Sequence, residues 1–218
     1  MALKIAVMGA GGIGGYYGGR LAAAGEDVAF IARGAHLQAM QRDGLKIISP
    51  LGDAHIQPVT ASDDPAGIGP VDIVMFCVKL YDVEQAAELC RPLVGPDTAV
   101  ISFLNGIDSE DRMKPILGAG HVVGGVAHIP SNIREPGVIE HKARLAALQF
   151  GEDDGAESPR LKAFLAVCRN AGIDARIAPD IRAAIWNKFV MLASFAAVCG
   201  LTRQPAGPIK HDPDVAAL

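Results

Sequence analysis

Lys4-Ile5-Ala6-Val7-Met8-Gly9-Ala10-Gly11-Gly12-Ile13-Gly14 is the stretch that decides the fold, because an apolar run leads directly into a glycine motif. The run 4–8 predicts a strand, and residues 13–24 predict a helix that follows the glycines. The order strand, glycine motif, helix is the arrangement that binds dinucleotides in open α/β sheets. A glycine motif alone is weak evidence in a chain with 25 glycines, since it also forms ordinary tight turns. Its position between strand and helix favours nucleotide binding.

Each position of the motif has a separate expected task. Gly9 permits a sharp exit from the strand, Gly11 lets the backbone approach a pyrophosphate with no Cβ in the way, and Gly14 brings helix and strand close together. Gly12 and Ile13 fall in the first turn of the helix, whose unpaired N–H groups would face the phosphates. We therefore expect these residues to bind the diphosphate of a dinucleotide.

The composition describes a globular chain without an affinity for nucleic acid. Its 218 residues suffice for one large domain, or for one domain and part of a second, and a 50% hydrophobic content supplies a buried core. The net charge is -4 and there is no run of Lys or Arg, so the electrostatic footprint of a nucleic-acid-binding protein is missing. Small anionic ligands need only a local positive site, which this charge balance allows.

Cysteine usage and the N-terminus indicate a cytoplasmic protein. The cysteines form no CxxC pair and fall mostly in apolar segments, which is typical of free thiols in a reducing compartment; they are Cys77, Cys90, Cys168 and Cys199. Glycines and Arg20 interrupt the apolar N-terminus, so it does not match a signal peptide. No membrane-spanning segment is expected, because the best candidate, 189–201, falls short of the ~20 residues required.

Strands and helices are predicted to alternate after the first helix. The predicted strands span 27–32, 71–78, 99–104, 121–127, 137–141, 145–150 and 174–177, and the predicted helices span 36–42, 83–93 and 159–171. Two shorter strands are predicted at 45–48 and 55–59, outside this alternation, and Pro50 and Gly52 separate them. This alternation is typical of an α/β fold, and we expect a Rossmann-type, doubly wound parallel sheet.

A domain boundary is expected at Asp180, which separates a nucleotide-binding domain, residues 1–179, from residues 180–218. Asp180 is suited to cap a long helix that runs to about Cys199. The second half of this helix, 189–199, is apolar all round and therefore needs burial on every side. Either another subunit covers it, as in a homodimer, or the chain is truncated. We favour the second interpretation, the start of an all-α substrate and dimerisation domain.

Arg33 favours NADP over NAD as the cofactor. It stands at the end of the second predicted strand, about 20 residues past the glycines, where NAD-binding proteins carry an acid for the ribose 2′-OH. A guanidinium binds a 2′-phosphate through forked, charge-assisted hydrogen bonds, whereas a carboxylate would repel it. The alternative is a solvated arginine in a loop.

Lys79, Asn105 and Lys188 are the candidates for chemistry. Lys79 and Asn105 follow two predicted strands, at the carboxyl edge where open α/β sheets bind ligands. Each could instead be an ordinary surface or turn residue, and Asn105-Gly106 is a common turn dipeptide. Lys188 is the last charge before the apolar half of the long helix. It could polarise a carbonyl and protonate the alkoxide formed by hydride transfer, or it could be a snorkelling surface lysine.

Metal and serine chemistry have no support in the sequence. The histidines show no HExxH or other ligand spacing, and there is no GxSxG elbow. His128, which precedes Ile129-Pro130-Ser131 at a strand end, could border a site, although a turn residue is the simpler interpretation.

The ordered set of motifs resembles the ketopantoate reductase family. The set comprises GAGGIGG at residues 9–15, Arg33, Cys77-Val78-Lys79, Leu104-Asn105-Gly106 and Ile185-Trp186-Asn187-Lys188, with Leu201-Thr202-Arg203 and Asp212-Pro213 beyond the long helix. The resemblance implies NADPH-dependent reduction of ketopantoate (2-dehydropantoate), a small 2-keto acid, to pantoate on the route to pantothenate and coenzyme A. It also implies that Lys188 is the general acid, and that Lys79 and Asn105 contact cofactor and substrate.

The chain departs from the family's pattern beside the lysine. Some members place asparagines on this helix to hold the substrate, whereas here it continues Phe189-Val190-Met191-Leu192-Ala193-Ser194. The acid and the serine that the family uses further along would lie beyond Leu218. Two alternatives therefore stay open: a related reductase for another 2-keto acid, and a non-catalytic NADP-binding protein.

Overall fold

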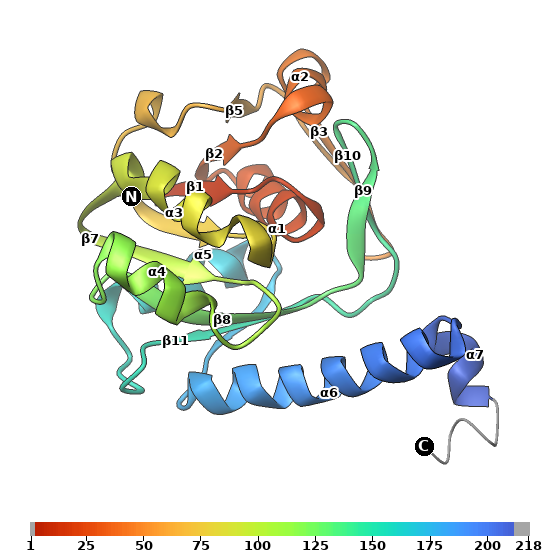
Figure 1. The fold of residues 1–218 in the computed structure, drawn as a ribbon. Coiled ribbons are helices and arrows are strands. Elements are labelled where there is room, and N and C mark those ends of the chain that lie inside the picture. Colours follow the sequence, from red (N-terminus) through yellow and green to blue (C-terminus); the bar gives the residue numbers. More distant parts are fainter. Residues whose placement is uncertain (1–2, 212–218) are drawn as a thin grey trace.

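The computed structural model describes residues 3–211, so the Asp212-Pro213 part of the resemblance lies outside the described residues. A central sheet of eight strands has the order β12-β11-β8-β7-β6-β1-β2-β5. Figure 1 shows helices on both faces of this sheet and the helix α6 running away from it. The strands are β1 (Lys4–Met8), β2 (Asp27–Ile31), β5 (Thr60–Ser62), β6 (Val71–Phe76), β7 (Val94–Ser102), β8 (Val122–His128), β11 (Ala147–Gly151) and β12 (Asp174–Ile177).

The strand order confirms the predicted Rossmann-type fold and corrects one detail. From β1 the chain adds β2 and β5 on one side, then returns to add β6, β7 and β8 on the other, so the order reverses between β1 and β6. These neighbours pair in parallel, but β11 pairs with β8 antiparallel. The sheet is therefore not wholly parallel, because strands rather than a crossover helix connect β8 to β11.

A second, smaller sheet lies beside the first. It has the order β4-β3-β10-β9 and consists of β3 (Leu45–Ile48), β4 (Ala54–Ile56), β9 (Ser131–Glu135) and β10 (Val138–His141). The two short strands predicted at 45–48 and 55–59 thus belong to this second sheet, together with the strand predicted at 137–141. The sequence pattern does not predict β9, because its residues Ser-Asn-Ile-Arg-Glu include a single apolar side chain.

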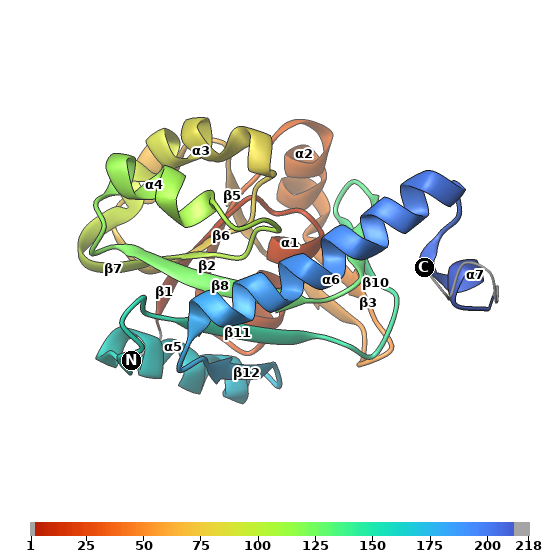
Figure 2. The ribbon, with the colours of Figure 1, turned by 60° about the horizontal axis from the view of Figure 1, so that its bottom comes forward.

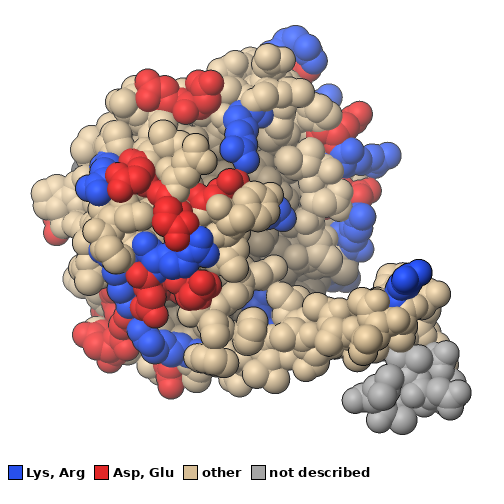
Figure 3. Space-filling view, in the orientation of Figure 1, with Lys and Arg blue, Asp and Glu red and all other residues tan. Residues whose placement is uncertain are grey.

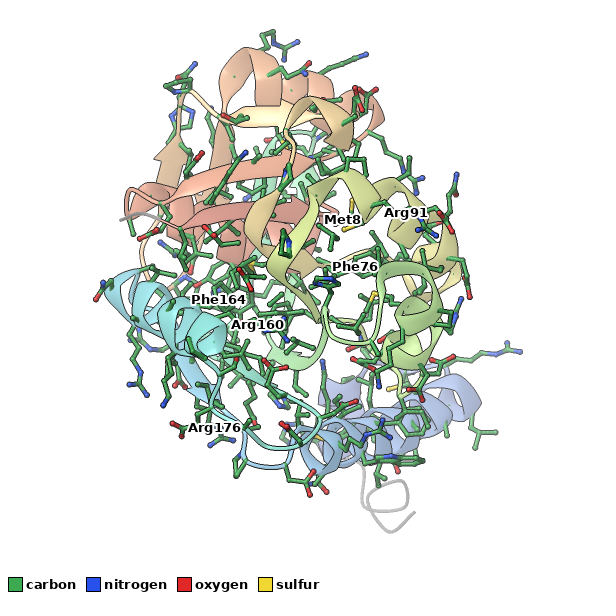
Figure 4. The ribbon with its side chains drawn as sticks, turned by 90° about the vertical axis from the view of Figure 1, so that its left-hand side faces the viewer. Met8, Phe76, Arg91, Arg160, Phe164 and Arg176 are labelled. Carbon is green, nitrogen blue, oxygen red and sulfur yellow. The ribbon has the colours of Figure 1, made fainter. Side chains whose placement is uncertain are left out.

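Helices on the two faces of the central sheet enclose two cores. Along β1, Ile5 and Val7 face the core under α1 and α5, whereas Ala6 and Met8 face the core under α3 and α4. In Figure 4, Phe164 on α5 and Met8 lie in these separate layers. The helices are α1 (Gly12–Ala23), α2 (Gly34–Asp43), α3 (Val83–Cys90), α4 (Ser109–Leu117), α5 (Pro159–Asn170), α6 (Ile181–Thr202) and α7 (Ala206–His211), with 3-10 turns η1 (Pro65–Gly67), η2 (Leu80–Asp82) and η3 (Arg91–Leu93).

Prolines account for the helix predictions that differ from the structure. The sequence does not predict α4, since Pro115 lies inside it and reads as a helix breaker. The helix expected to run to residue 93 stops at Cys90, and Pro92 belongs to the 3-10 turn η3 that follows.

Helix α1 is packed tightly between the two sheets. A Cβ at Gly18 would lie 2.6 Å from Val7 Cγ2 and 2.7 Å from the Phe30 ring, on the central sheet. A Cβ at Gly15 would lie 2.8 Å from Ile139, on the second sheet. Such contacts are too close for real Cβ atoms, so both faces of the helix require glycine for this separation.

Helix α6 begins as predicted but is less covered than expected. The Asp180 side chain accepts a hydrogen bond from the Ala183 N–H at 2.9 Å and caps the helix. Gly124 on β8 lets the helix approach, since a Cβ there would lie 2.8 Å from Ile181. Beyond this first turn, α6 crosses β8 and β11 obliquely and then extends past them (Figure 2), with a surface almost free of charge (Figure 3). The burial expected for 189–199 is not found within residues 3–211.

The length of α6 also corrects the expectation that no segment could span a bilayer. The helix has 22 residues, an 18-residue window of it has a mean hydropathy of 1.6, and it is the one helix within residues 3–211 that is long and apolar enough. The expectation counted only the uncharged run, whereas the helix also includes Arg182 and Lys188. Length and composition are weak evidence for a membrane span, because helices that pack inside soluble proteins give the same pattern.

The packing of α1 can be tested with a single methyl group. Gly18→Ala should lower the free energy of unfolding by about 1–2 kcal/mol, because the overpacking outweighs the gain in helix propensity. Urea denaturation measures the change. The matched control is Gly120→Ala, since nothing lies within 4 Å of a Cβ at Gly120; we expect a change within about 0.5 kcal/mol there. Equal stability of the two variants would contradict the close packing of α1.

Candidate cofactor cleft and active site

A cleft of about 350 Å³ opens at the carboxyl ends of β1, β2 and β6. The strand order reverses at this place, and open α/β sheets bind their ligands there. The glycine motif, the strand ends and β9 all contribute to its walls, among them Gly9, Gly11, Arg33, His36, Lys79 and Ile133. Fold and chain order thus bring residues of the predicted cofactor site to one cavity.

The glycine loop leaves room for a diphosphate. Gly9 has φ of +100°, and a Cβ there would lie 3.0 Å from the Cys77 carbonyl group, so both backbone and space require glycine. Gly11, in contrast, is surrounded by open space, because no atom lies within 4 Å of its Cβ position. Gly11 also lines the cleft. No side chain caps the N-terminus of α1 at Gly11. The first-turn N–H groups and this open space fit the diphosphate of a nicotinamide dinucleotide.

Gly12, Ile13 and Gly14 of the motif lie behind the cleft rather than in its wall. A Cβ at Gly12 would collide with the carbonyl group of Ser131 at the start of β9, and one at Gly14 would collide with the Gly9 carbonyl oxygen. Ile13 is half-buried and packs against the core. These residues can reach a phosphate only through their backbone N–H groups, and that contact stays a prediction.

His36 links the glycine loop to the second sheet. Its Nε2 lies 2.9 Å from the Ala10 carbonyl oxygen, and its Nδ1 accepts a hydrogen bond from the Gly137 N–H at 3.0 Å. These partners require a neutral ring with its proton on Nε2, and burial favours that form by lowering the pKa of His36. No sequence signal could identify this contact, because the two partners are 101 residues apart.

Charged side chains gather at the mouth of the cleft. Arg33 Nη2 lies 3.0 Å from Asp82 Oδ2, with the arginine side chain 81% exposed, and Asp63 also lines the cleft. Sequence patterns single out neither carboxylate, since Asp63 follows the unpredicted strand β5 and Asp82 lies in η2. Exposed ion pairs contribute only about 0–1 kcal/mol, so Arg33 can exchange Asp82 for a phosphate at small cost.

Asn105 and Lys188 line a second, smaller pocket together. Asn105 follows the end of β7, Lys188 comes from α6, and Gly125 and Val126 on β8 also line the pocket. Gly125 keeps this part of β8 close to β7, since a Cβ there would lie 2.5 Å from the Ser102 carbonyl oxygen. Neither helical periodicity nor strand pattern predicts that α6 crosses the sheet edge at this place.

Lys188 is held by the backbone of β8. Its Nζ donates a hydrogen bond to the Ala127 carbonyl oxygen at 2.6 Å, and burial lowers the pKa of Lys188 to about 8. His128 is the last residue of β8 rather than a turn residue, and its pKa is lowered by burial and by the charges of Lys188 and Arg176. The Ala127 carbonyl group therefore holds a partly desolvated ammonium group in the pocket that Asn105 also lines, which suits the binding of a polar oxygen atom.

The two cavities follow one another along the sheet edge. Lys79 lies in the cleft rather than in the smaller pocket. β1, β6 and β7 are neighbours, so Asn105 follows a strand that is about 10 Å from the strand before the glycine loop. Within residues 3–211 there is no group of three or more His, Cys, Asp or Glu side chains that could hold a metal ion.

Comparisons with known proteins identify the family and the fold of this chain. The family described as ketopantoate reductase PanE/ApbA matches residues 5–155. A 2-dehydropantoate 2-reductase of Mesorhizobium japonicum is 30% identical over 237 residues, which cover 99% of this chain and 72% of that protein. The crystal structure of 2-dehydropantoate 2-reductase from Geobacter metallireducens has a TM-score of 0.91 at 35% identity, covering 98% of this chain and 70% of that one. The structure of D-mandelate dehydrogenase with NADH and anilino(oxo)acetate is similar in fold alone, with a TM-score of 0.88 at 18% identity over 98% and 69% of the two chains.

Proposed function

The chain belongs to the ketopantoate reductase family of oxidoreductases, and on this premise we propose that it reduces the 2-keto group of 2-dehydropantoate to pantoate with NADPH. The observation that carries the proposal is the meeting of Asn105 and Lys188 in one pocket near the glycine-lined cleft. The amide of Asn105 and the ammonium group of Lys188 are hydrogen-bond donors, and a 2-keto acid offers them its keto and carboxylate oxygens as acceptors.

The residues of the smaller pocket have complementary tasks in this reaction. When bound, the nicotinamide supplies a hydride to the keto carbon. Lys188 polarises the keto oxygen and gives it a proton as the alkoxide forms. An ammonium group has more than one N–H, so Lys188 can keep its hydrogen bond to Ala127 while it binds the substrate. Asn105, which lines the same pocket, orients the substrate.

The apolar walls of the pocket favour a substrate with a branched carbon chain. The other α6 side chains that line the pocket with Lys188 are apolar; they are Ile185, Phe189 and Leu192. The polar groups therefore recognise the 2-keto acid, while these apolar side chains contact its carbon chain. The branched chain of 2-dehydropantoate suits such walls. The second candidate is another branched or aromatic 2-keto acid, because these side chains stand where some relatives carry substrate-binding asparagines.

Arg33 is the residue that we assign to the 2′-phosphate of NADPH. Its exposed guanidinium is paired only at the rim, and a phosphate dianion offers it stronger, forked hydrogen bonds than Asp82 does. Gly9, Gly11 and the first turn of α1 would hold the diphosphate, and Lys79 contributes a positive charge to the same cleft. The division after residue 179, the cytoplasmic location and the homodimer stay predictions.

Steady-state assays with NADPH test the substrate assignment. We expect kcat/KM for 2-dehydropantoate to exceed that for unbranched 2-keto acids by at least about tenfold, since each methyl group contributes that much discrimination in an apolar pocket. A larger value for an aromatic or differently branched acid would select the second candidate. A protein that binds NADPH but turns over no 2-keto acid would be a non-catalytic NADP-binding protein.

Substitution of Arg33 tests the cofactor assignment. Arg33→Ala should weaken NADPH binding by about 10- to 100-fold and leave NADH binding nearly unchanged, because the charge-assisted contact forms with the 2′-phosphate alone. Fluorescence titration with both nucleotides measures the two dissociation constants. Arg42→Ala is the matched control, since Arg42 lies on α2, the helix that follows Arg33, outside the cleft and pairs with Asp43. Equal losses for both nucleotides would remove the assignment.

Substitution of Lys188 tests the proton donor. Lys188→Ala should lower kcat by about 100-fold or more, with NADPH affinity nearly intact. In the unsubstituted protein, kcat/KM should fall as the pH rises through about 8, because the neutral amine has no proton to give. Arg182→Ala, on the same helix but outside the pocket, should leave both properties unchanged. An unchanged kcat, or the same pH-dependent fall in Lys188→Ala, would refute the role of Lys188.

A further inference from the structure

Asn105 lies in a short loop whose conformation needs an explanation. The loop, residues 103–108, connects the end of β7 to the start of α4 and has no regular secondary structure. Asn105 is exposed, and Gly106 has φ of +115°, which side chains rarely adopt. Phe103 and Leu104 fix the first part of the loop by their burial in the core, so the path of residues 105–108 depends on where α4 begins.

A buried polar cluster joins the two ends of this loop. Ser102 is the last residue of β7, Ser109 is the first residue of α4, and their hydroxyl oxygens lie 2.8 Å apart. The carboxylate of Glu110 faces both hydroxyl groups and its own backbone N–H as an acceptor. Each hydroxyl group has one hydrogen, so one donates to the other and the second is left to donate to the carboxylate. All three side chains are buried, with Glu110 only 9% exposed. The cluster therefore connects strand to helix beneath the loop that carries Asn105.

Burial of an ionised carboxylate at this position costs free energy. Burial raises the pKa of Glu110, the negative charge of Asp153 adds to the rise, and hydrogen bonds to the carboxylate oppose it. An apolar side chain of similar volume would avoid the desolvation cost, whereas the first turn of α4 favours an acid through the helix dipole. The carboxylate also provides directed hydrogen bonding between the end of β7 and the start of α4.

We propose that Glu110 is a positioning residue, which joins Ser102 to Ser109 and thereby holds the Asn105 amide in the pocket that Lys188 also lines. The inference rests on the proposed function insofar as Asn105 contacts the substrate. Glu110 itself touches neither pocket, so its effect on the reaction passes through Asn105.

Amide hydrogen exchange tests the positioning without any turnover. With each variant held equally far below its own unfolding midpoint, Glu110→Ala should speed exchange at residues 103–107 by at least about tenfold and leave β8 unchanged. Glu110→Gln keeps an oxygen acceptor at the same place, so exchange should stay within about threefold of the unsubstituted protein.

Met113→Ala is the matched control for the exchange experiment. Met113 is fully buried on the same helix, and its truncation leaves a cavity without removing the polar cluster. It should lower the unfolding midpoint but leave exchange in the loop unchanged. Equal acceleration in Met113→Ala and Glu110→Ala, or no acceleration in Glu110→Ala, would overturn the proposal.

A double-mutant cycle tests whether Glu110 acts through Asn105. Glu110→Ala should lower kcat/KM for the keto acid by about tenfold, and Glu110→Gln should restore most of it. In the Asn105→Ala background, Glu110→Ala should cause no further loss, whereas additive losses would contradict the proposal. If the unsubstituted protein turns over no keto acid, the proposed function fails, and the exchange experiment still decides whether Glu110 positions the loop.

Discussion

The close approach of helix α1 to two sheets is the constraint on which the rest of the structure depends. Gly18 faces the central sheet and Gly15 faces the second sheet, and at each a Cβ would lie within 3 Å of a neighbouring side chain. This packing fixes the height of the helix N-terminus above the end of β1, where the glycine loop forms. If the helix moved outward by the width of a methyl group, the loop and its open space at Gly11 would move with it.

The second sheet extends this constraint to the mouth of the cleft. β9 meets the first turn of α1 at Gly12, and Ile133 from the same strand lines the cleft. His36 connects the loop to the turn between β9 and β10 through its two ring nitrogens. The cleft that we assign to the nucleotide is therefore a junction of two sheets and a helix rather than a property of the glycine motif alone.

The two cavities differ in how their charges are solvated. Arg33 and Asp82 sit at an exposed rim, where water screens them and partners exchange at small cost. Lys188 is partly desolvated, so its proton is held less tightly and its charge acts on nearby oxygens more strongly. This contrast suits a cofactor that binds and leaves at the rim and a proton transfer that takes place in the inner pocket.

The sequence by itself determined the alternation of strands and helices, the glycine loop and the strand ends that carry Arg33, Lys79 and Asn105, because these follow from local patterns of apolar runs and glycines. Pairing across the chain determined the rest: β9 pairs with β10 although it is mostly polar, and His36 meets Gly137. The path of α6 across β8 likewise brings Lys188 to Asn105 through close packing at Gly124 and Gly125. Local patterns record which face of a segment is buried, whereas such meetings depend on which distant segments fill the same space, and that is decided only when the whole core packs.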